Sequence, residues 1–142
     1  MDAKTARKIL VRQHVRIREH LSTCSVLGRR FRSGESVLGE LDEALEQLRT
    51  DFMEHNVTET SLVAPLLHGS PDWGHLLIDR MLEEHVAEHV AFWELLAGSA
   101  ADVVYRIDDL VDELDAHMAA EERTFLSPTV LHPDAIARHA ST

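Results

Sequence analysis

The sequence is poor in several residue types, and each shortage excludes a class of protein. It contains one cysteine, Cys24, so the chain cannot form an internal disulfide. No apolar run approaches the roughly 18 residues that a membrane span needs, and the first residues lack the apolar core of a signal peptide. Together these absences predict a cytoplasmic protein that does not enter a membrane.

Positive charge is also scarce, whereas histidine is abundant. Fourteen Lys and Arg residues stand against 25 Asp and Glu residues, so the net charge is −11 with histidine counted as neutral. This balance disfavours nucleic acid and anionic membranes as partners, and bound metal cations would offset part of it. Ten histidines are many for a chain of 142 residues, which is the length of one domain. The surplus of histidine points to a function.

Apolar residues recur every three or four positions almost throughout the chain, and no convincing alternation of period two occurs. This periodicity predicts an all-α protein. We expect helices over about residues 3–31, 35–64, 72–96 and 101–125, with Pro65 ending or kinking the second. The short links predict an up-down-up-down four-helix bundle over residues 1–128, followed by a C-terminal tail over residues 129–142.

Four histidines are expected at the same depth in this bundle, one in each helix. The midpoints between consecutive members fall on or beside the predicted links, near residues 34, 70 and 101. Antiparallel neighbours place two residues at equal depth when both lie equally far from the turn, so the imidazoles should meet in one layer across the bundle axis. The four are His14, His55, His85 and His117.

Three further residues extend this layer by one helical turn. Glu59 follows His55 by four residues, and residues four apart project from the same face of a helix. Polar groups inside a bundle are costly unless something pairs them, and a metal ion pairs with both histidine and carboxylate. The predicted metal ligands are His14, His55, Glu59, His85, His89, His117 and Glu121.

Seven candidate ligands exceed what one tetrahedral zinc ion uses. They suit two ions of octahedral type, bridged by both carboxylates and by one solvent-derived oxygen. Mixed imidazole and carboxylate ligation is compatible with iron or with manganese. Three neighbouring acids, Glu84, Glu88 and Glu122, are expected to be solvated or to bind the outer nitrogen of a ligand histidine. No catalytic residue beyond the metal ligands is evident.

This pattern resembles the hemerythrin-like family, also called the HHE cation-binding domain. The resemblance covers the chain to about Pro128 and rests on His14, His55-x-x-x-Glu59, His85 and His117-x-x-x-Glu121. It implies a four-helix bundle that holds two iron ions in a non-haem centre with an oxo or hydroxo bridge. By this resemblance the five histidines would be terminal ligands, and the two glutamates would bridge the ions.

One feature differs from the oxygen carriers of that family. Their last carboxylate is an aspartate five residues after its histidine, and this chain has Glu122 there. The inward stripe selects Glu121 instead, because Glu122 is rotated by about 100° around the helix. This difference disfavours simple reversible oxygen carriage, although His89 matches a histidine that the carriers use.

The remaining side chains of interest are expected to have ordinary roles. Phe52, Phe92 and Trp93 should wall the layer and limit the access of solvent, and Cys24 should be a small core residue. Five histidines are expected at the surface or paired within the fold, without a role in the layer: His20, His68, His75, His132 and His139.

Three functions are compatible with such a centre. The first is chemistry on a small oxygen or nitrogen species, such as catalase-like dismutation of hydrogen peroxide, or the handling of nitric oxide or oxygen. The second is a non-enzymatic module that binds or senses oxygen or iron, and the third is a structural metal bundle. We favour the first, with a small diatomic or peroxide ligand, no nucleic-acid or membrane partner, and a monomeric chain.

Overall fold

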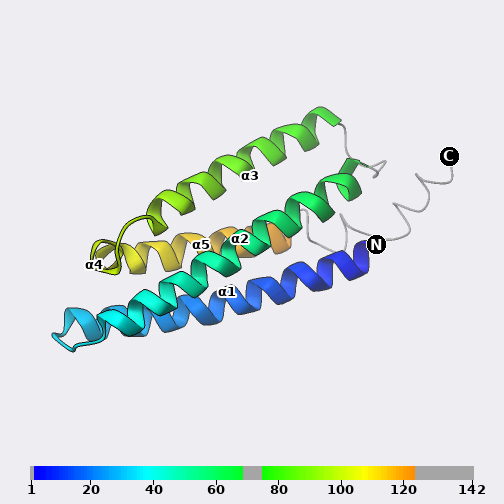
Figure 1. Ribbon diagram of the computed structural model, residues 1–142. Helices are drawn as coiled ribbons and strands as arrows, with labels where there is room; N and C mark the ends of the chain where they lie inside the picture. Colours follow the sequence, from blue (N-terminus) through cyan, green and yellow to red (C-terminus); the bar gives the residue numbers. More distant parts are fainter. Residues whose placement is uncertain (1, 69–74, 124–142) are drawn as a thin grey trace.

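The computed structural model describes residues 2–68 and 75–123, which form helices and no strand. The long helices lie side by side and alternate in direction (Figure 1), so the predicted all-α bundle is confirmed. α1 packs against α2 and α5, and α3 packs against the same two helices. The elements are α1 (Ala3–Arg32), α2 (Leu38–His68), α3 (His75–Leu96), α4 (Ala100–Val103), η1 (Val104–Arg106) and α5 (Ile107–Arg123).

Both ends of α1 follow from local hydrogen bonding. The Asp2 side chain accepts a hydrogen bond from the Thr5 backbone N–H at 2.7 Å and caps the first turn. At the other end, Gly34 has a φ of +94°, and the Glu35 N–H donates to the Arg30 carbonyl at 3.1 Å. Glu35 therefore belongs to the end of α1, which explains why α2 begins at residue 38 and not at residue 35 as predicted.

The predicted fourth helix is interrupted. Ser99 and Asp102 form a capping box at the start of α4, which lasts one turn before the 3-10 turn η1 and then α5. The Arg32 guanidinium donates to the Val104 carbonyl at 2.9 Å, and a carbonyl held by a side chain can leave the regular ladder. The prediction of one continuous helix over residues 101–125 is therefore wrong in this detail.

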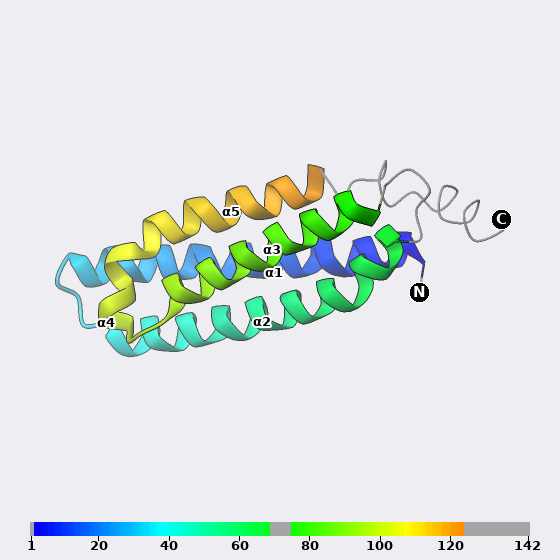
Figure 2. The ribbon, with the colours of Figure 1, turned by 90° about the horizontal axis from the view of Figure 1, so that it is seen from above.

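Pro65 lies inside α2, so the helix does not end there. Figure 2 shows that the last turns of α2 bend away from the line of the rest of the helix, as expected where a proline removes a backbone donor. The start of the third helix at residue 72, the end of the fourth at residue 125 and the tail over residues 129–142 lie outside the described residues. None of the described helices is long and apolar enough to cross a membrane.

The buried side chains divide the bundle along its length. Near the α1–α2 and α3–α4 links the interior is apolar, and its fully buried residues include Leu41, Leu45, Leu110 and Leu114. The next layer contains the predicted metal ligands, which are buried but polar. Beyond this layer the interior is apolar again at Leu10 of α1. The fold therefore holds a polar layer between apolar ones.

Candidate metal centre

The seven predicted ligand residues converge in this polar layer, and each is at most 8% exposed. Nitrogen and oxygen atoms of six of these residues form two groups, within each of which the candidate ligand atoms lie within 4.8 Å of one another. The convergence that the spacing predicts is thus found, while binding of a metal by these residues stays a prediction. The first group is His14, His55 and Glu121, and the second is His85, His89, His117 and Glu121.

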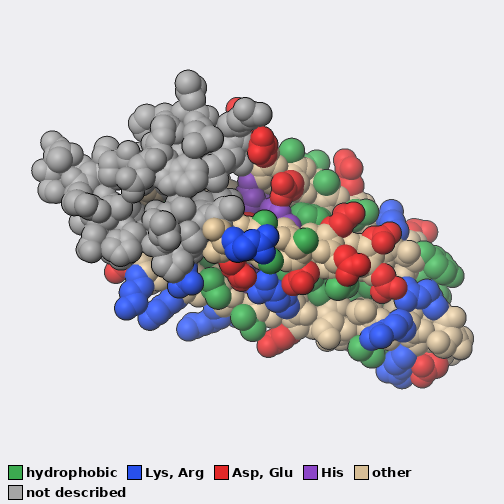
Figure 3. Space-filling view, turned by 180° about the vertical axis from the view of Figure 1, so that it is seen from behind, with side chains coloured by type: hydrophobic (Ala, Val, Ile, Leu, Met, Phe, Trp, Pro, Cys, Tyr) green, Lys and Arg blue, Asp and Glu red, His purple; other side chains and the backbone are tan. Residues whose placement is uncertain are grey.

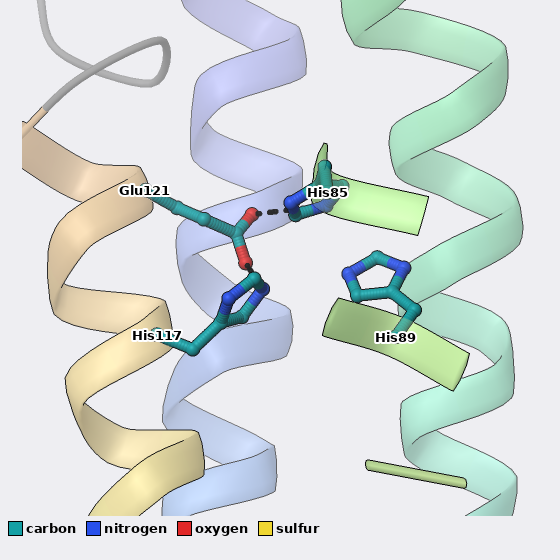
Figure 4. A group of neighbouring side chains, drawn as sticks. All are labelled: His85, His89, His117 and Glu121. Atoms are coloured by element: carbon teal, nitrogen blue, oxygen red, sulfur yellow. Dashed lines mark ion pairs between the residues drawn. The ribbon is translucent and has the colours of Figure 1, made fainter. Parts of the chain in front are cut away.

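Glu121 of α5 belongs to both groups. One of its oxygens, Oε1, lies 2.7 Å from His117 Nε2 and 3.8 Å from His14 Nε2. The other, Oε2, lies 3.8 Å from the Nε2 atoms of both His55 and His85. Figure 4 shows Glu121 and His117 on α5 facing His85 and His89 on α3. The carboxylate of Glu121 therefore reaches imidazoles on all three of the other long helices.

Glu59 of α2 links the same two sets of histidines from the opposite side. Its Oε2 lies 2.8 Å from His55 Nε2, and its Oε1 contacts His85 Nε2. Glu59 belongs to neither group, but it contacts one histidine of each, His55 and His85. Each carboxylate in the layer thus touches a histidine of each group.

Three of the candidate ligand histidines have a hydrogen-bond acceptor at the outer nitrogen, Nδ1. An acceptor at Nδ1 holds the proton there, so that Nε2 directs its lone pair into the layer. The contacts of His14 and His55 are both 3.0 Å long. The pairs are His14 with Glu122, His55 with Gln13, and His117 with Glu88.

Adjacent residues on α5 face in different directions. Glu121 is 2% exposed and points into the layer. Glu122 is 29% exposed and meets α1, where it contacts the outer nitrogen of His14. The predicted rotation between the two glutamates is confirmed, and Glu122 pairs with a candidate ligand histidine as expected.

Two residues around the layer were not singled out from the sequence. Arg18 donates to both oxygens of Glu122, at 3.0 and 3.2 Å, and Gln13 joins His55 to the Thr58 hydroxyl. Both residues stand close to His14 in the sequence, on the flanks of the inward stripe of α1. Their position in the sequence was the one indication of a role near the layer. It does not reveal which side chain of the neighbouring helix each residue contacts.

Burial and neighbouring charges have opposite effects on the pKa values of several residues in the layer. Burial lowers the pKa of His89 to about 3, and it also lowers the pKa of His14. Burial acts in the same direction on His55, but the facing carboxylates of Glu121 and Glu59 outweigh it and raise the pKa of His55 to about 9. Among the carboxylates, burial raises the pKa of Glu59. Burial also opposes ionisation of Glu121, yet His117 and His55 hold its pKa well below the usual range.

The buried atoms fit a cation better than they fit one another. Both oxygens of Glu59 and of Glu121, and Nε2 of His89 and His117, make no hydrogen bond of good geometry within the described part of the chain. This holds even where the distance to an imidazole suits an ion pair. Unsatisfied buried polar atoms cost free energy. These oxygens and nitrogens converge on one layer, which is the arrangement that metal ligands have. The donor set therefore fits a metal site.

Aromatic side chains close the layer toward the apolar core, as predicted. The Phe52 ring meets His89 and Trp93 edge to face at 5.5 and 5.6 Å, and the Phe92 ring lies 5.1 Å from His117. The three histidines of α3 and α5 are each 8% exposed, whereas His14 and His55 are at most 1% exposed. Figure 3 shows a small area of histidine surface beside acidic side chains.

Of the five histidines that we expect to have no role in the layer, the structure describes the side chain of His20. It contacts the buried carboxylate of Asp51 on α2 and belongs to neither group of candidate ligands. It is therefore paired within the fold, as expected. The side chains of His68 and His75, and both His132 and His139, lie outside the described part of the structure.

Comparison with known proteins agrees with this geometry. Residues 5–127 match the family model described as the hemerythrin HHE cation binding domain. No curated protein and no solved structure matched the chain. The buried layer of histidine and carboxylate and the match over most of the sequence lead to one conclusion: the chain belongs to the hemerythrin HHE cation-binding family of metal-binding domains.

Proposed function

We propose that the layer binds a pair of iron ions and that this centre reacts with, or binds, small oxygen or nitrogen species. The observation that carries the proposal is the position of the two carboxylates, Glu59 and Glu121. Each of them contacts a histidine of both groups, which is what a ligand shared by two ions requires. Family membership favours iron over other metals.

The two ion positions differ in the number of protein ligands. His14 and His55 would serve one position, and His85, His89 and His117 would serve the other. With one oxygen from each carboxylate, the first position would have four protein donor atoms and the second would have five. Iron commonly takes six ligands, so the first position leaves more room for a ligand from solution.

The residues around the layer select small ligands. Phe52 and Phe92 fill the side toward the apolar core, and each of the seven candidate ligands is at most 8% exposed. When bound, a pair of iron ions supplies redox chemistry toward molecules such as hydrogen peroxide, oxygen and nitric oxide. Dismutation of two hydrogen peroxide molecules to one oxygen and two water molecules needs no further co-reactant, so it is the first reaction to test.

The test compares protein loaded with iron(II) under anaerobic conditions with the same protein loaded with zinc. We expect the visible spectrum of the iron form to change on addition of hydrogen peroxide, oxygen or nitric oxide, and the zinc form to stay unchanged. Oxygen release in molar excess over the iron would assign dismutation. A coloured oxygen adduct that disappears under vacuum would assign binding without turnover. An iron-loaded protein that responds to none of the three molecules would contradict the proposal.

A further inference from the structure

The outer nitrogen of His14 lies at the inner end of a chain of charged groups that reaches the surface. His14 is fully buried, and its Nδ1 lies 3.0 Å from Glu122 Oε1. The Arg18 guanidinium donates to both oxygens of Glu122 and, through Nε, to Asp115 at 2.9 Å. Arg18 and Glu122 are each about one-third exposed. A surface arginine is thus connected to a candidate ligand through a single carboxylate.

The other two outer contacts in the layer have a different character. The Nδ1 of His55 meets the side-chain oxygen of Gln13, which is a neutral acceptor. The Nδ1 of His117 meets Glu88, whose side chain is 56% exposed and therefore well screened by water. Of the three pairs, the contact with His14 combines a charged acceptor, partial burial and a cation that fixes the acceptor in place.

We propose that Glu122 and Arg18 are positioning residues that act in opposite directions on the strength with which His14 donates to its metal ion. This inference rests on the di-iron centre of the proposed function. A carboxylate that accepts the Nδ1 proton makes the imidazole a stronger ligand through Nε2. Arg18 draws part of the Glu122 charge toward itself through two charge-assisted hydrogen bonds, and so moderates that effect.

The two residues also bridge α1 and α5, so a purely structural role must be distinguished from tuning of the ligand. A structural bridge would be weakened in the same sense by loss of either partner. Tuning of the ligand instead predicts that the two variants shift the reduction potential of the centre in opposite directions. Glu122→Gln keeps an acceptor oxygen but removes the charge, which should raise the reduction potential of the centre. Arg18→Gln leaves the Glu122 charge uncompensated, which should lower the potential.

The experiment measures the reduction potential and the rate of iron release to a chelator for both variants in the full chain. Loss of a hydrogen-bond partner of a metal ligand typically lowers metal affinity by roughly 10- to 100-fold. We expect a loss of affinity in that range for one of the two ions in Glu122→Gln. Release should then become biphasic. Asp108→Asn is the matched control, because Asp108 pairs with Arg32 across the same two helices at 3.2 Å without contacting a candidate ligand.

Thermal unfolding of the metal-free variants measures the structural contribution separately, and Arg18→Met, which also removes the charge, replaces Arg18→Gln if that variant fails to fold. Shifts of the potential in the same direction in the two variants, or no shift in Glu122→Gln, would overturn the inference while the di-iron centre stands. Wild-type protein that retains no iron would overturn both the centre and the inference. Asp108→Asn should leave the potential and the release rate unchanged.

Discussion

Two neighbouring parts of the bundle are equally buried but depend on different interactions. In the apolar half, side chains such as Leu45 and Leu110 are fully buried, and each gains about 1.5–3 kcal/mol by leaving water. In the histidine–carboxylate layer, burial of residues such as Glu59 and Glu121 costs free energy unless a partner satisfies them. The apolar half, near the α1–α2 and α3–α4 links, can thus hold the helices in place, whereas the layer needs a partner for its buried polar atoms.

The largest effect is expected when the carboxylate that both histidine groups share is removed. Glu121→Ala should abolish retention of the iron pair, because Glu121 reaches His14, His55, His85 and His117. Metal analysis of protein passed through a desalting column measures this loss. Glu113→Ala, at an exposed position on the same helix, is the control. Retention of both ions in Glu121→Ala would show that Glu121 is not a shared ligand.

A cavity in the apolar half should have the converse effect. Leu45 is fully buried among apolar side chains, so Leu45→Ala should lower the free energy of unfolding by about 2–5 kcal/mol. The loss should be similar in the metal-free and iron-loaded forms, and the iron content should stay at the wild-type level. Chemical denaturation of both forms measures it. A loss confined to the iron-loaded form would mean that the two parts are not separable.

A smaller effect is expected where the layer meets solvent. Glu88 contacts the outer nitrogen of His117, but its side chain is 56% exposed, so water can take over part of its role. Glu88→Gln should therefore speed the release of iron to a chelator by less than Glu122→Gln does. The same measurement of iron release to a chelator compares the two variants. A larger effect for Glu88 would reverse the ranking by exposure.

The smallest effect is expected at the cysteine of the apolar half. Cys24 is buried, and burial raises the pKa of its thiol to about 11. The thiolate is the reactive form, so its fraction is very small at pH 8 and rises as the pH approaches the pKa. At pH 8 iodoacetamide should modify the native protein far more slowly than the denatured protein, as followed by mass spectrometry. Equal rates for the two would contradict this burial.

The recurrence of apolar residues every three or four positions explains which features could be predicted from the sequence. Helical spacing determines the face and the depth of a residue, so the meeting of His14, His55 and Glu121 follows from positions along the chain. Helical spacing did not predict the interruption of the fourth helix into α4, η1 and α5. It accompanies a contact of Arg32 with the Val104 carbonyl, which joins two helices distant in sequence.

The outer contacts of the layer show the same limit. A pattern of three and four residues separates inward from outward positions, but it does not identify the partner of a residue on the flank of a helix. Arg18 and Gln13 lie on such flanks of α1, and their roles depend on the orientation of α5 and α2. The Glu35 backbone is a similar case, because it completes the end of α1 instead of starting α2.

The most direct test is the number of iron ions held by one chain. Anaerobic loading with iron(II), removal of the excess and native mass spectrometry give this number for each molecule. A centre in which Glu59 and Glu121 are shared between the two histidine groups predicts two iron ions per chain, lost together in Glu121→Ala. A wild-type protein with one ion or none after loading would contradict it.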